Sequence, residues 1–236
     1  MDSFMRRIDK SIHLSLNYFT WLEQITLGGN VHPKWKNKTI RNSYHKEVIM
    51  NLYHCQDGLC AYTEKRLCRQ YLFSADKWVD EKYTYENKPE HDGHPDHYNN
   101  TLKKDRAWSW DNLFMTHVVV NNNKGIKATL DYLKPDNINY NPFTFFLYNF
   151  DFHLYEVKQN ENLTNAQIEE IEHQIKDVLF LNHDPIIGDR ETLYKVINQL
   201  LEYYNNDWNR VLDKICKLGM YEFPTLIEFI RLEKGL

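Results

Sequence analysis

The chain has 236 residues, of which 42% are hydrophobic and 26% charged, and these ordinary globular values exclude wholesale disorder. No apolar run approaches the length of a membrane span, and the N-terminus holds no uninterrupted apolar segment typical of a secretion signal. The formal net charge of −4 argues against a free-standing nucleic-acid binder. We therefore expect a cytoplasmic protein that does not associate with membranes.

In the first half of the chain, apolar residues recur at three- and four-residue spacing over about 4–27, which predicts an amphipathic helix ending at Gly28. Residues 31–42 are basic and irregular, and a second helix is predicted over 43–55. Residues 74–106 are polar and lack periodicity, so we expect a long loop with little regular structure. Loops of that length in a compact domain are often functional.

The pattern changes after Asp111. Residues 112–116 predict a short strand, and residues 118–125 predict a turn that enters a short helix. Two apolar segments, 143–148 and 152–157, then predict a β-hairpin.

The remainder of the chain has the spacing of helices. Thr164 and Gln167 form the capping box of one helix, and Asp189 is expected to cap the next. The fold class is therefore α+β, with a small centre that includes a hairpin and is surrounded by N-terminal and C-terminal helices. The expected divisions are an N-terminal helical segment at 1–57, a centre with the long loop at 58–160, and a C-terminal helical region at 161–236.

Five polar residues form the candidate site: Asp96, His97, Asn112, Asn121 and Lys124. Taken singly, each has an ordinary explanation, since Asp-His in a polar loop is usually solvated and consecutive asparagines suit turns. Their order suits metal-assisted phosphodiester hydrolysis, in which histidine takes a proton from water and a cation offsets charge on the phosphate. Magnesium needs one or two protein oxygen ligands.

Three segments resemble one bacterial group of HNH, or ββα-metal, nucleases. "CAYTE" at 60–64 resembles the opening CAYCE of that group, and "WSWDNLFMTHVVVNNNKG" at 108–125 resembles its W-x-NL-x-x-SC-x-x-CN-x-x-KG segment. "LFLNHDPIIGDR" at 179–190 resembles its helical C-terminal part. The similarity covers about 58–190, and the group includes the nuclease subunit of Septu-type anti-phage systems, which works with an ATPase partner.

The resemblance implies a role for each candidate residue. His97 becomes the general base, Asn112 the structural asparagine that orients the His97 loop, and Lys124 a phosphate contact. Asp96 and Asn121 become the ligands of Mg²⁺ or Mn²⁺, with the register among Asn121, Asn122 and Asn123 left open. It further implies a ββα-metal core within 58–160 and a DNA-cleaving effector of anti-phage defence.

The chain departs from the group at the structural zinc site, where two C-x-x-C pairs are expected. Cys60 is kept, but Thr63, His117 and Val120 stand at the other three positions. We therefore expect no structural zinc in that site. A substitute site that draws on other cysteines and histidines, including Cys55, Cys68 and His54, stays an alternative.

Two alternative functions and the partners also remain open. The lost zinc ligands favour a non-catalytic interaction subunit on an HNH scaffold, and RNA is a possible substrate because no base-reading element is visible. Residues 164–236 carry many large aromatic side chains, which predicts docking of a companion ATPase or a second copy. The segment from His97 to Lys134 contains six cationic and three acidic residues. Six cations are enough for weak, salt-sensitive contact with DNA.

Overall fold

The computed structural model describes residues 7–85, 90–159 and 163–236 and has a mixed α+β fold. The α-helices are α1 (Leu16–Leu27), α2 (Lys38–Ile40), α3 (Lys46–Cys55), α4 (Val118–Lys124), α5 (Pro142–Phe145), α6 (Asn165–His173), α7 (Asp184–Tyr203), α8 (Trp208–Lys217) and α9 (Pro224–Glu233). The strands are β1 (Trp78–Val79), β2 (Lys82–Tyr83), β3 (Gly93–His97), β4 (Leu113–His117), β5 (Phe146–Asn149) and β6 (Leu154–Val157). Within the described ranges these strands pair as three separate antiparallel sheets, β1–β2, β3–β4 and β5–β6.

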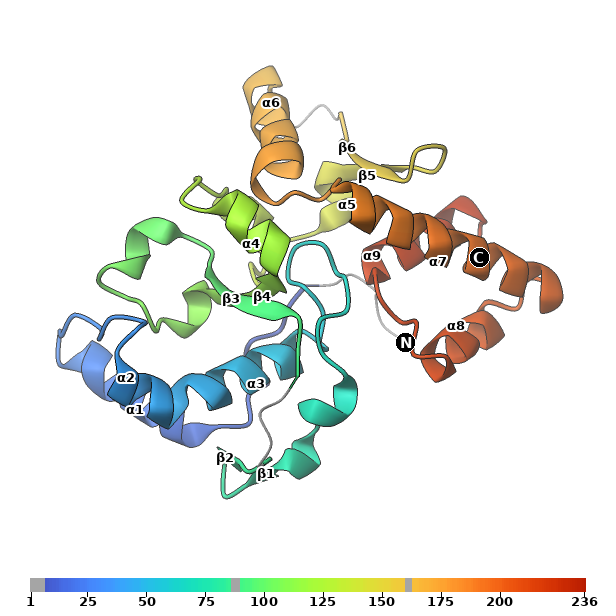
Figure 1. Ribbon diagram of the computed structural model, residues 1–236. Coiled ribbons are helices and arrows are strands. Elements are labelled where there is room, and N and C mark those ends of the chain that lie inside the picture. The colour runs from blue at the N-terminus through green and yellow to red at the C-terminus, as the bar shows by residue number, and fades with distance from the viewer. Residues whose placement is uncertain (1–6, 86–89, 160–162) are drawn as a thin grey trace.

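The centre of the molecule is the β3–β4 sheet, which lies between α3 and α4 (Figure 1). Leu113, Phe114 and Met115 of β4 are completely buried, because helices cover both faces of this small sheet. Helix α4 follows β4 without a loop and ends at Gly125, whose φ of +51° suits a glycine after a helix. The result is a strand–strand–helix unit whose parts contact one another directly.

The predicted N-terminal helix is wrong before Leu16, and residues 1–6 lie outside the described residues. The segment before α1 is irregular, with a turn at residues 10–11, and is held by distant partners instead. The Nζ of Lys10 forms a buried ion pair with Asp136 at 3.1 Å and donates to the carbonyl of Trp110 at 2.8 Å. The backbone N–H of Ile8 donates to Pro135. Tertiary hydrogen bonds therefore override the helical spacing of this segment.

The second predicted helix is confirmed and is longer than expected. Helix α2 continues through a π-helical turn, Arg41–His45, into α3. Asn37 begins α2, since its side chain accepts the backbone N–H of Ile40 at 3.2 Å. The basic segment before α3 is therefore partly helical.

The prediction of an irregular loop over 74–106 is wrong in part, because this segment contains β1, β2 and β3. The sequence of β3, Gly-His-Pro-Asp-His, lacks the apolar alternation of a strand. Pairing with the buried strand β4 makes it a strand, in a register that sets Asp96 opposite Phe114 and His97 opposite Leu113.

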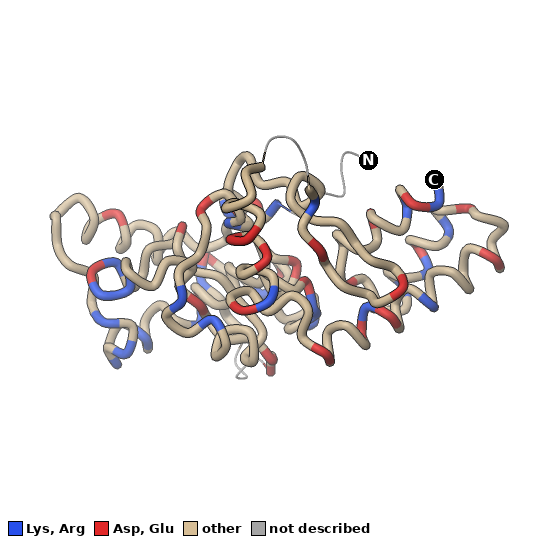
Figure 2. The backbone as a smooth tube through the Cα atoms, turned by 90° about the horizontal axis from the view of Figure 1, so that it is seen from above, with Lys and Arg blue, Asp and Glu red and all other residues tan. Residues whose placement is uncertain are grey.

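The predicted hairpin is confirmed as β5–β6, although α5 takes up the first residues of its expected first strand. The capping box of Thr164 and Gln167 is also confirmed. Asp189, however, does not cap a helix: α7 begins at Asp184, and Asp189 lies inside it, where it pairs with Lys65. Helix α7 packs against α8 and α9, and these three lie at the opposite end of the molecule from α1 and α2 (Figures 1 and 2).

The C-terminal helices are tied to the segment around Lys65 by a set of hydrogen bonds. The Glu64 carboxylate accepts the backbone N–H of Thr225 at 2.9 Å and its hydroxyl at 2.6 Å. The backbone N–H of Phe223 donates to the carbonyl of Glu64, and Arg66 donates to that of Tyr221.

No helix within the described ranges has the length and apolar character needed to cross a membrane.

Candidate active site

Asp96 and His97 are consecutive residues at the end of β3, and both side chains are buried, with exposed fractions of 4% and 3%. Because they are neighbours on a strand, they meet different partners. His97 lies against the N-terminal segment and the loop that joins β3 to β4. Asp96 lies against α4 and the segment that begins at Cys60. The strand thus separates a candidate base from a candidate metal ligand.

The imidazole of His97 is fixed by a backbone carbonyl and an aromatic ring. Its Nε2 lies 2.8 Å from the carbonyl oxygen of Ala107, and the ring of Trp35 meets it edge to face at 5.5 Å. Since a carbonyl oxygen only accepts, Nε2 carries the proton and Nδ1 is the basic nitrogen. Burial lowers the pKa of His97 to about 4, so the ring is neutral at pH 7 and able to accept a proton.

Asn112 stands immediately before β4 and holds the chain that follows His97. Its amide oxygen accepts the backbone N–H of Asn99 at 2.8 Å, and its amide nitrogen donates to the carbonyl of Asn99 at 3.0 Å. The backbone N–H of Tyr98 also donates to the carbonyl of Asn112 at 2.9 Å. The hydrogen bonds expected from this amide to the loop are therefore present, and they fix the exit of β3.

Lys124 does not lie where the sequence suggested. Instead of an exposed ammonium facing a phosphate, its Nζ is fully buried 3.2 Å from both carboxylate oxygens of Asp96 and 2.8 Å from the carbonyl of His97. The last turn of α4 packs on β3, so the side chain enters the centre. Burial lowers the pKa of Lys124 and raises that of Asp96, hence each charge depends on the other.

A second donor to Asp96 is Tyr62, whose hydroxyl lies 2.6 Å from Oδ2. Tyr62 belongs to the segment "CAYTE", and nothing in that segment predicted a contact with Asp96. The bond to Asp96 makes it part of the site. Trp35 was missed altogether, because it lies in an irregular basic segment about sixty residues before His97 and nothing local links the two.

The three consecutive asparagines of α4 have different surroundings. The amide nitrogen of Asn121 lies 3.4 Å from the carbonyl of Pro95, the residue before Asp96. Asn122 is exposed, and Asn123 donates to the carbonyl of Asp177 at 2.8 Å. Asn121 is therefore the asparagine that meets β3 beside Asp96, as a metal ligand partnered with Asp96 must.

The chemistry of Asp96 and Asn121 fits a magnesium-type ion, which prefers oxygen ligands and keeps several waters. The ammonium of Lys124 already places one positive charge against the Asp96 carboxylate. A carboxylate has about four acceptor positions, so the bonds from Tyr62 and Lys124 do not exhaust it. Within the described residues no three His, Cys, Asp or Glu side chains converge on one point, so any cation here would depend on Asn121 and water as well.

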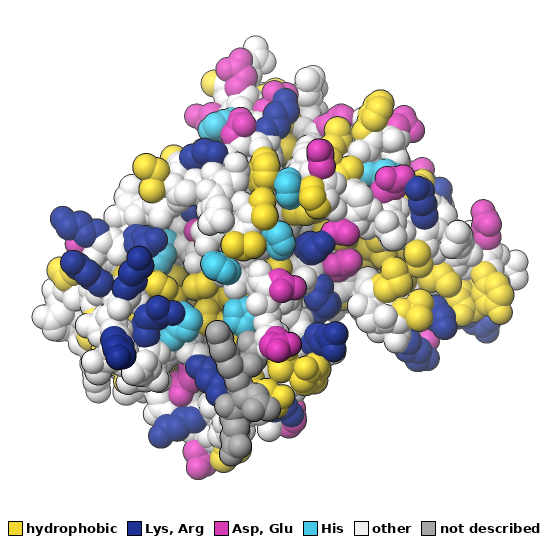
Figure 3. Space-filling view, in the orientation of Figure 1, with side chains coloured by type: hydrophobic (Ala, Val, Ile, Leu, Met, Phe, Trp, Pro, Cys, Tyr) yellow, Lys and Arg dark blue, Asp and Glu magenta, His cyan; other side chains and the backbone are white. Residues whose placement is uncertain are grey.

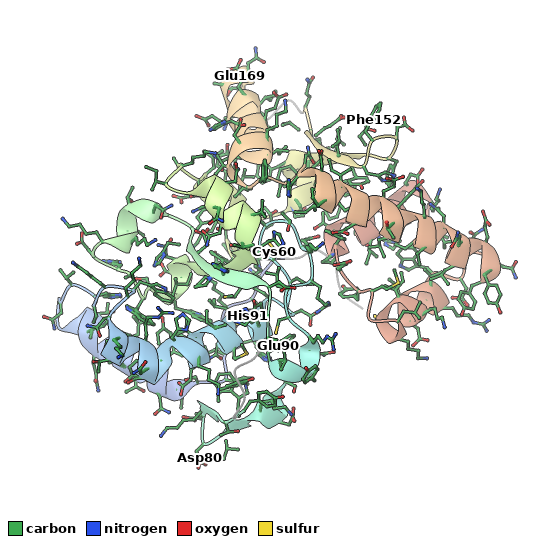
Figure 4. All side chains as sticks on the ribbon, in the orientation of Figure 1. Cys60, Asp80, Glu90, His91, Phe152 and Glu169 are labelled. Carbon is green, nitrogen blue, oxygen red and sulfur yellow. The ribbon has the colours of Figure 1, made fainter. Side chains whose placement is uncertain are left out.

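Three of the positions at which the resembling group has zinc ligands, Cys60, Thr63 and His117, lie together behind the site, where Cys60 lies near the start of α4 (Figure 4). The Sγ of Cys60 accepts the backbone N–H groups of Thr63 at 3.5 Å and His117 at 3.4 Å. The hydroxyl of Thr63 and Nδ1 of His117 are buried without a hydrogen-bond partner among the described atoms. Threonine and valine at positions 63 and 120 do not fit a tetrahedral zinc site.

Comparison with known proteins adds no relative: no protein-family model matches the chain, and no curated protein matches its sequence. The residues and their geometry therefore carry the functional argument.

Proposed function

We propose that the chain is a divalent-metal-dependent endonuclease of the HNH type that hydrolyses phosphodiester bonds of DNA. The observation that carries this proposal is the strand–strand–helix unit formed by β3, β4 and α4. It carries Asp96 and His97 on its first strand, Asn112 immediately before its second, and Asn121 on its helix. This is the order in which the resembling nucleases arrange ligand, base, structural asparagine and second ligand.

In this proposal each residue of the site has a separate role. Asn112 holds the backbone after His97, and Ala107 holds Nε2, so that Nδ1 is free to take a proton from water. Asp96 and Asn121 would hold a divalent cation, which supplies charge neutralisation at the phosphate when bound. Lys124, buried against Asp96 and the carbonyl of His97, would hold that carboxylate in position rather than contact the phosphate.

Plasmid cleavage with Mg²⁺ or Mn²⁺ tests the proposal. We expect His97→Ala to lower the rate by about 10²–10⁴-fold, the usual contribution of a general base. The matched control is His94→Ala, which removes an exposed imidazole from the same strand and should leave the rate unchanged. Equal rates for native protein and His97→Ala would refute the assignment of the base. Parallel assays with RNA separate the DNA-cleaving from the RNA-cleaving alternative.

A second candidate, a non-catalytic HNH scaffold, is favoured by one observation: the carboxylate of Asp96 is buried and already paired with Lys124. Isothermal titration calorimetry, which measures the binding of Mn²⁺, distinguishes the two candidate functions. A nuclease should bind Mn²⁺ and lose that binding in Asp96→Asn. A scaffold should bind no Mn²⁺ in either form.

We further propose, on the motif resemblance alone, that the protein is the effector of an anti-phage complex with a companion ATPase or a second copy. Of the aromatic residues considered for docking, Tyr203 is 77% exposed, whereas Phe223 is fully buried. Co-purification with an ATPase encoded beside it tests this role. Tyr203→Ser should weaken the association if the surface of α7 takes part.

A further inference from the structure

A basic surface lies beside His97 and is built from two segments that are far apart in the sequence. The first is residues 34–41, and the second is residues 103–106 of the loop between β3 and β4. They are joined through His32, whose backbone N–H donates to the carbonyl of Asp105 at 2.9 Å and whose Nδ1 lies 3.3 Å from the backbone nitrogen of Trp108. We call these two segments together the basic surface.

The basic surface is connected to the candidate site by Trp35. Its ring lies 4.2 Å from that of Trp108 and 5.5 Å from that of His97. Lys34 and Lys36 flank Trp35 directly and are exposed. The exposed lysines therefore belong to the same short segment whose aromatic ring contacts the candidate base.

The charges of this surface are available to a ligand. Its seven cations are all exposed, and none forms an ion pair with a described residue: Lys34, Lys36, Lys38, Arg41, Lys103, Lys104 and Arg106. No acidic residue occurs from Val31 to Lys46, and Asp105 is the single acid of the second segment. Because the whole chain has a net charge of −4 and this surface has +6, the rest of the chain has −10.

The distribution is visible on the molecule. Lys and Arg gather on the side that carries α2 and the loop after β3 (left in Figure 3), and Figure 2 shows basic residues along the backbone at the same end. A hollow of about 440 Å³ opens in the first segment, lined by Lys36, Lys38, Arg41, Asn42 and His45. Lys36, Lys38, Arg41 and Asn42 carry N–H groups that can donate hydrogen bonds to phosphate oxygens, whereas Nε2 of His45 faces the Arg41 guanidinium at 3.5 Å.

We propose that the basic surface binds the backbone of duplex DNA on one side of the bond that is cut, with one phosphate in the hollow at Arg41. This deepens the proposed function and rests on it for the position of the cut. DNA carries one negative charge per about 1.7 Å of helix axis, so several phosphates meet the seven cations at once. The rest of the chain has a net negative charge and repels DNA, so the DNA approaches the protein at the basic surface.

Duplex rather than single-stranded DNA is favoured by the aromatic residues of the surface. Proteins that bind single strands stack bases on exposed aromatic rings between the cations. Here Trp35 is the single aromatic residue of the two segments, and it is half-buried and packed on Trp108, so no exposed ring lies between the cations. The surface therefore contacts phosphates without reading bases.

The test is fluorescence anisotropy with a labelled DNA duplex in EDTA, where binding is measured without cleavage. The variant is Lys36→Gln/Lys38→Gln/Arg41→Gln in the full chain. Its matched control is Lys176→Gln/Lys195→Gln/Lys217→Gln, which removes three exposed lysines from the C-terminal helical region. We expect at least about a tenfold rise in Kd for the variant, and a decrease in its salt slope of about 0.9 for each phosphate that the surface no longer neutralises. The control should change much less.

Several outcomes decide the proposal. Equal Kd values for the variant and its control would overturn it, as would competition by single-stranded DNA, RNA or polyglutamate as strong as that by duplex DNA. A thermal melt of the variant equal to that of native protein excludes misfolding as the cause of weaker binding. Failure of the nuclease proposal looks different: the native protein would bind duplex DNA through this surface and still leave a plasmid uncut with Mg²⁺ or Mn²⁺.

Discussion

The ammonium nitrogen of Lys124 lies 3.2 Å from each carboxylate oxygen of Asp96, and neither side chain is more than 4% exposed. The pair joins the last turn of α4 to β3. Loss of one partner leaves the other charge buried without compensation, whereas loss of both removes the problem.

We therefore predict that Lys124→Met lowers the free energy of unfolding by about 3–5 kcal/mol. The double variant Lys124→Met/Asp96→Asn should lose much less, because no buried charge remains. Urea denaturation measures both. Lys176→Met serves as control, since its ion pair with Glu172 is exposed and contributes about 0.5 kcal/mol or less. A double variant as unstable as Lys124→Met would contradict the ion-pair account.

Gly93 begins β3 and packs tightly against Tyr53. A Cβ atom at this position would lie 2.2 Å from the Tyr53 hydroxyl oxygen, and Tyr53 is fully buried. We predict that Gly93→Ala lowers the free energy of unfolding by about 1–3 kcal/mol, the range for overpacking a core. Gly188→Ala is the matched control: it lies within α7 with open space around it, and we expect a gain of about 0.5–1 kcal/mol. Thermal melts that show equal shifts would count against the contact with Tyr53.

His45 makes stability dependent on pH. Burial, together with the charges of Arg41 and His91, lowers its pKa to about 4 in the folded protein, against about 6.5 in an unfolded chain. Between these values the unfolded state binds more protons, so the free energy of unfolding falls as pH decreases from about 6.5 to about 4. We predict a smaller fall for His45→Gln in urea denaturation at a series of pH values. If the free energy of unfolding depends on pH equally in the native protein and in His45→Gln, the pKa of His45 is the same in the folded and unfolded states.

Two substitutions should create a zinc site at positions 60, 63, 117 and 120. Cys60 already accepts two backbone N–H groups, and His117 holds a buried Nδ1 without a hydrogen bond among the described atoms. We predict that Thr63→Cys/Val120→Cys binds one Zn²⁺ per chain and melts at a higher temperature with zinc than with EDTA. Native mass spectrometry measures the stoichiometry, with Thr63→Cys alone as the control. If the double variant takes up no zinc, positions 60, 63, 117 and 120 do not share the geometry of a knuckle.

The elements of the fold that depend on neighbouring residues could be predicted from the sequence. The capping box of Thr164 and Gln167 and the β5–β6 hairpin follow from neighbouring residues, and the structure confirms both. Strand β3 could not be predicted, because Pro95 and the polar residues around it form a strand only through pairing with β4. The irregular path before α1 depends on the Lys10–Asp136 ion pair, which no local pattern reveals.

The same limit applies to the candidate site. The motif resemblance grouped Asp96, His97, Asn112 and Asn121 as one candidate site, and the structure brings them to one strand–strand–helix unit. The spacing of Lys124 from Asn121 did not reveal that its side chain points into the centre, since that depends on how α4 packs on β3. The contact of Trp35 with His97 joins distant segments and required the tertiary structure.

The bonds from Glu64 to Thr225 span 161 positions of the chain, and they buttress the segment that carries Tyr62. During synthesis on the ribosome, Asp96, His97 and Asn121 emerge long before Thr225 does. Until then the nascent chain lacks the residue that holds Glu64, two positions after the Tyr62 donor to Asp96. A chain that ends ahead of Thr225 therefore carries all five candidate residues but neither of these two bonds.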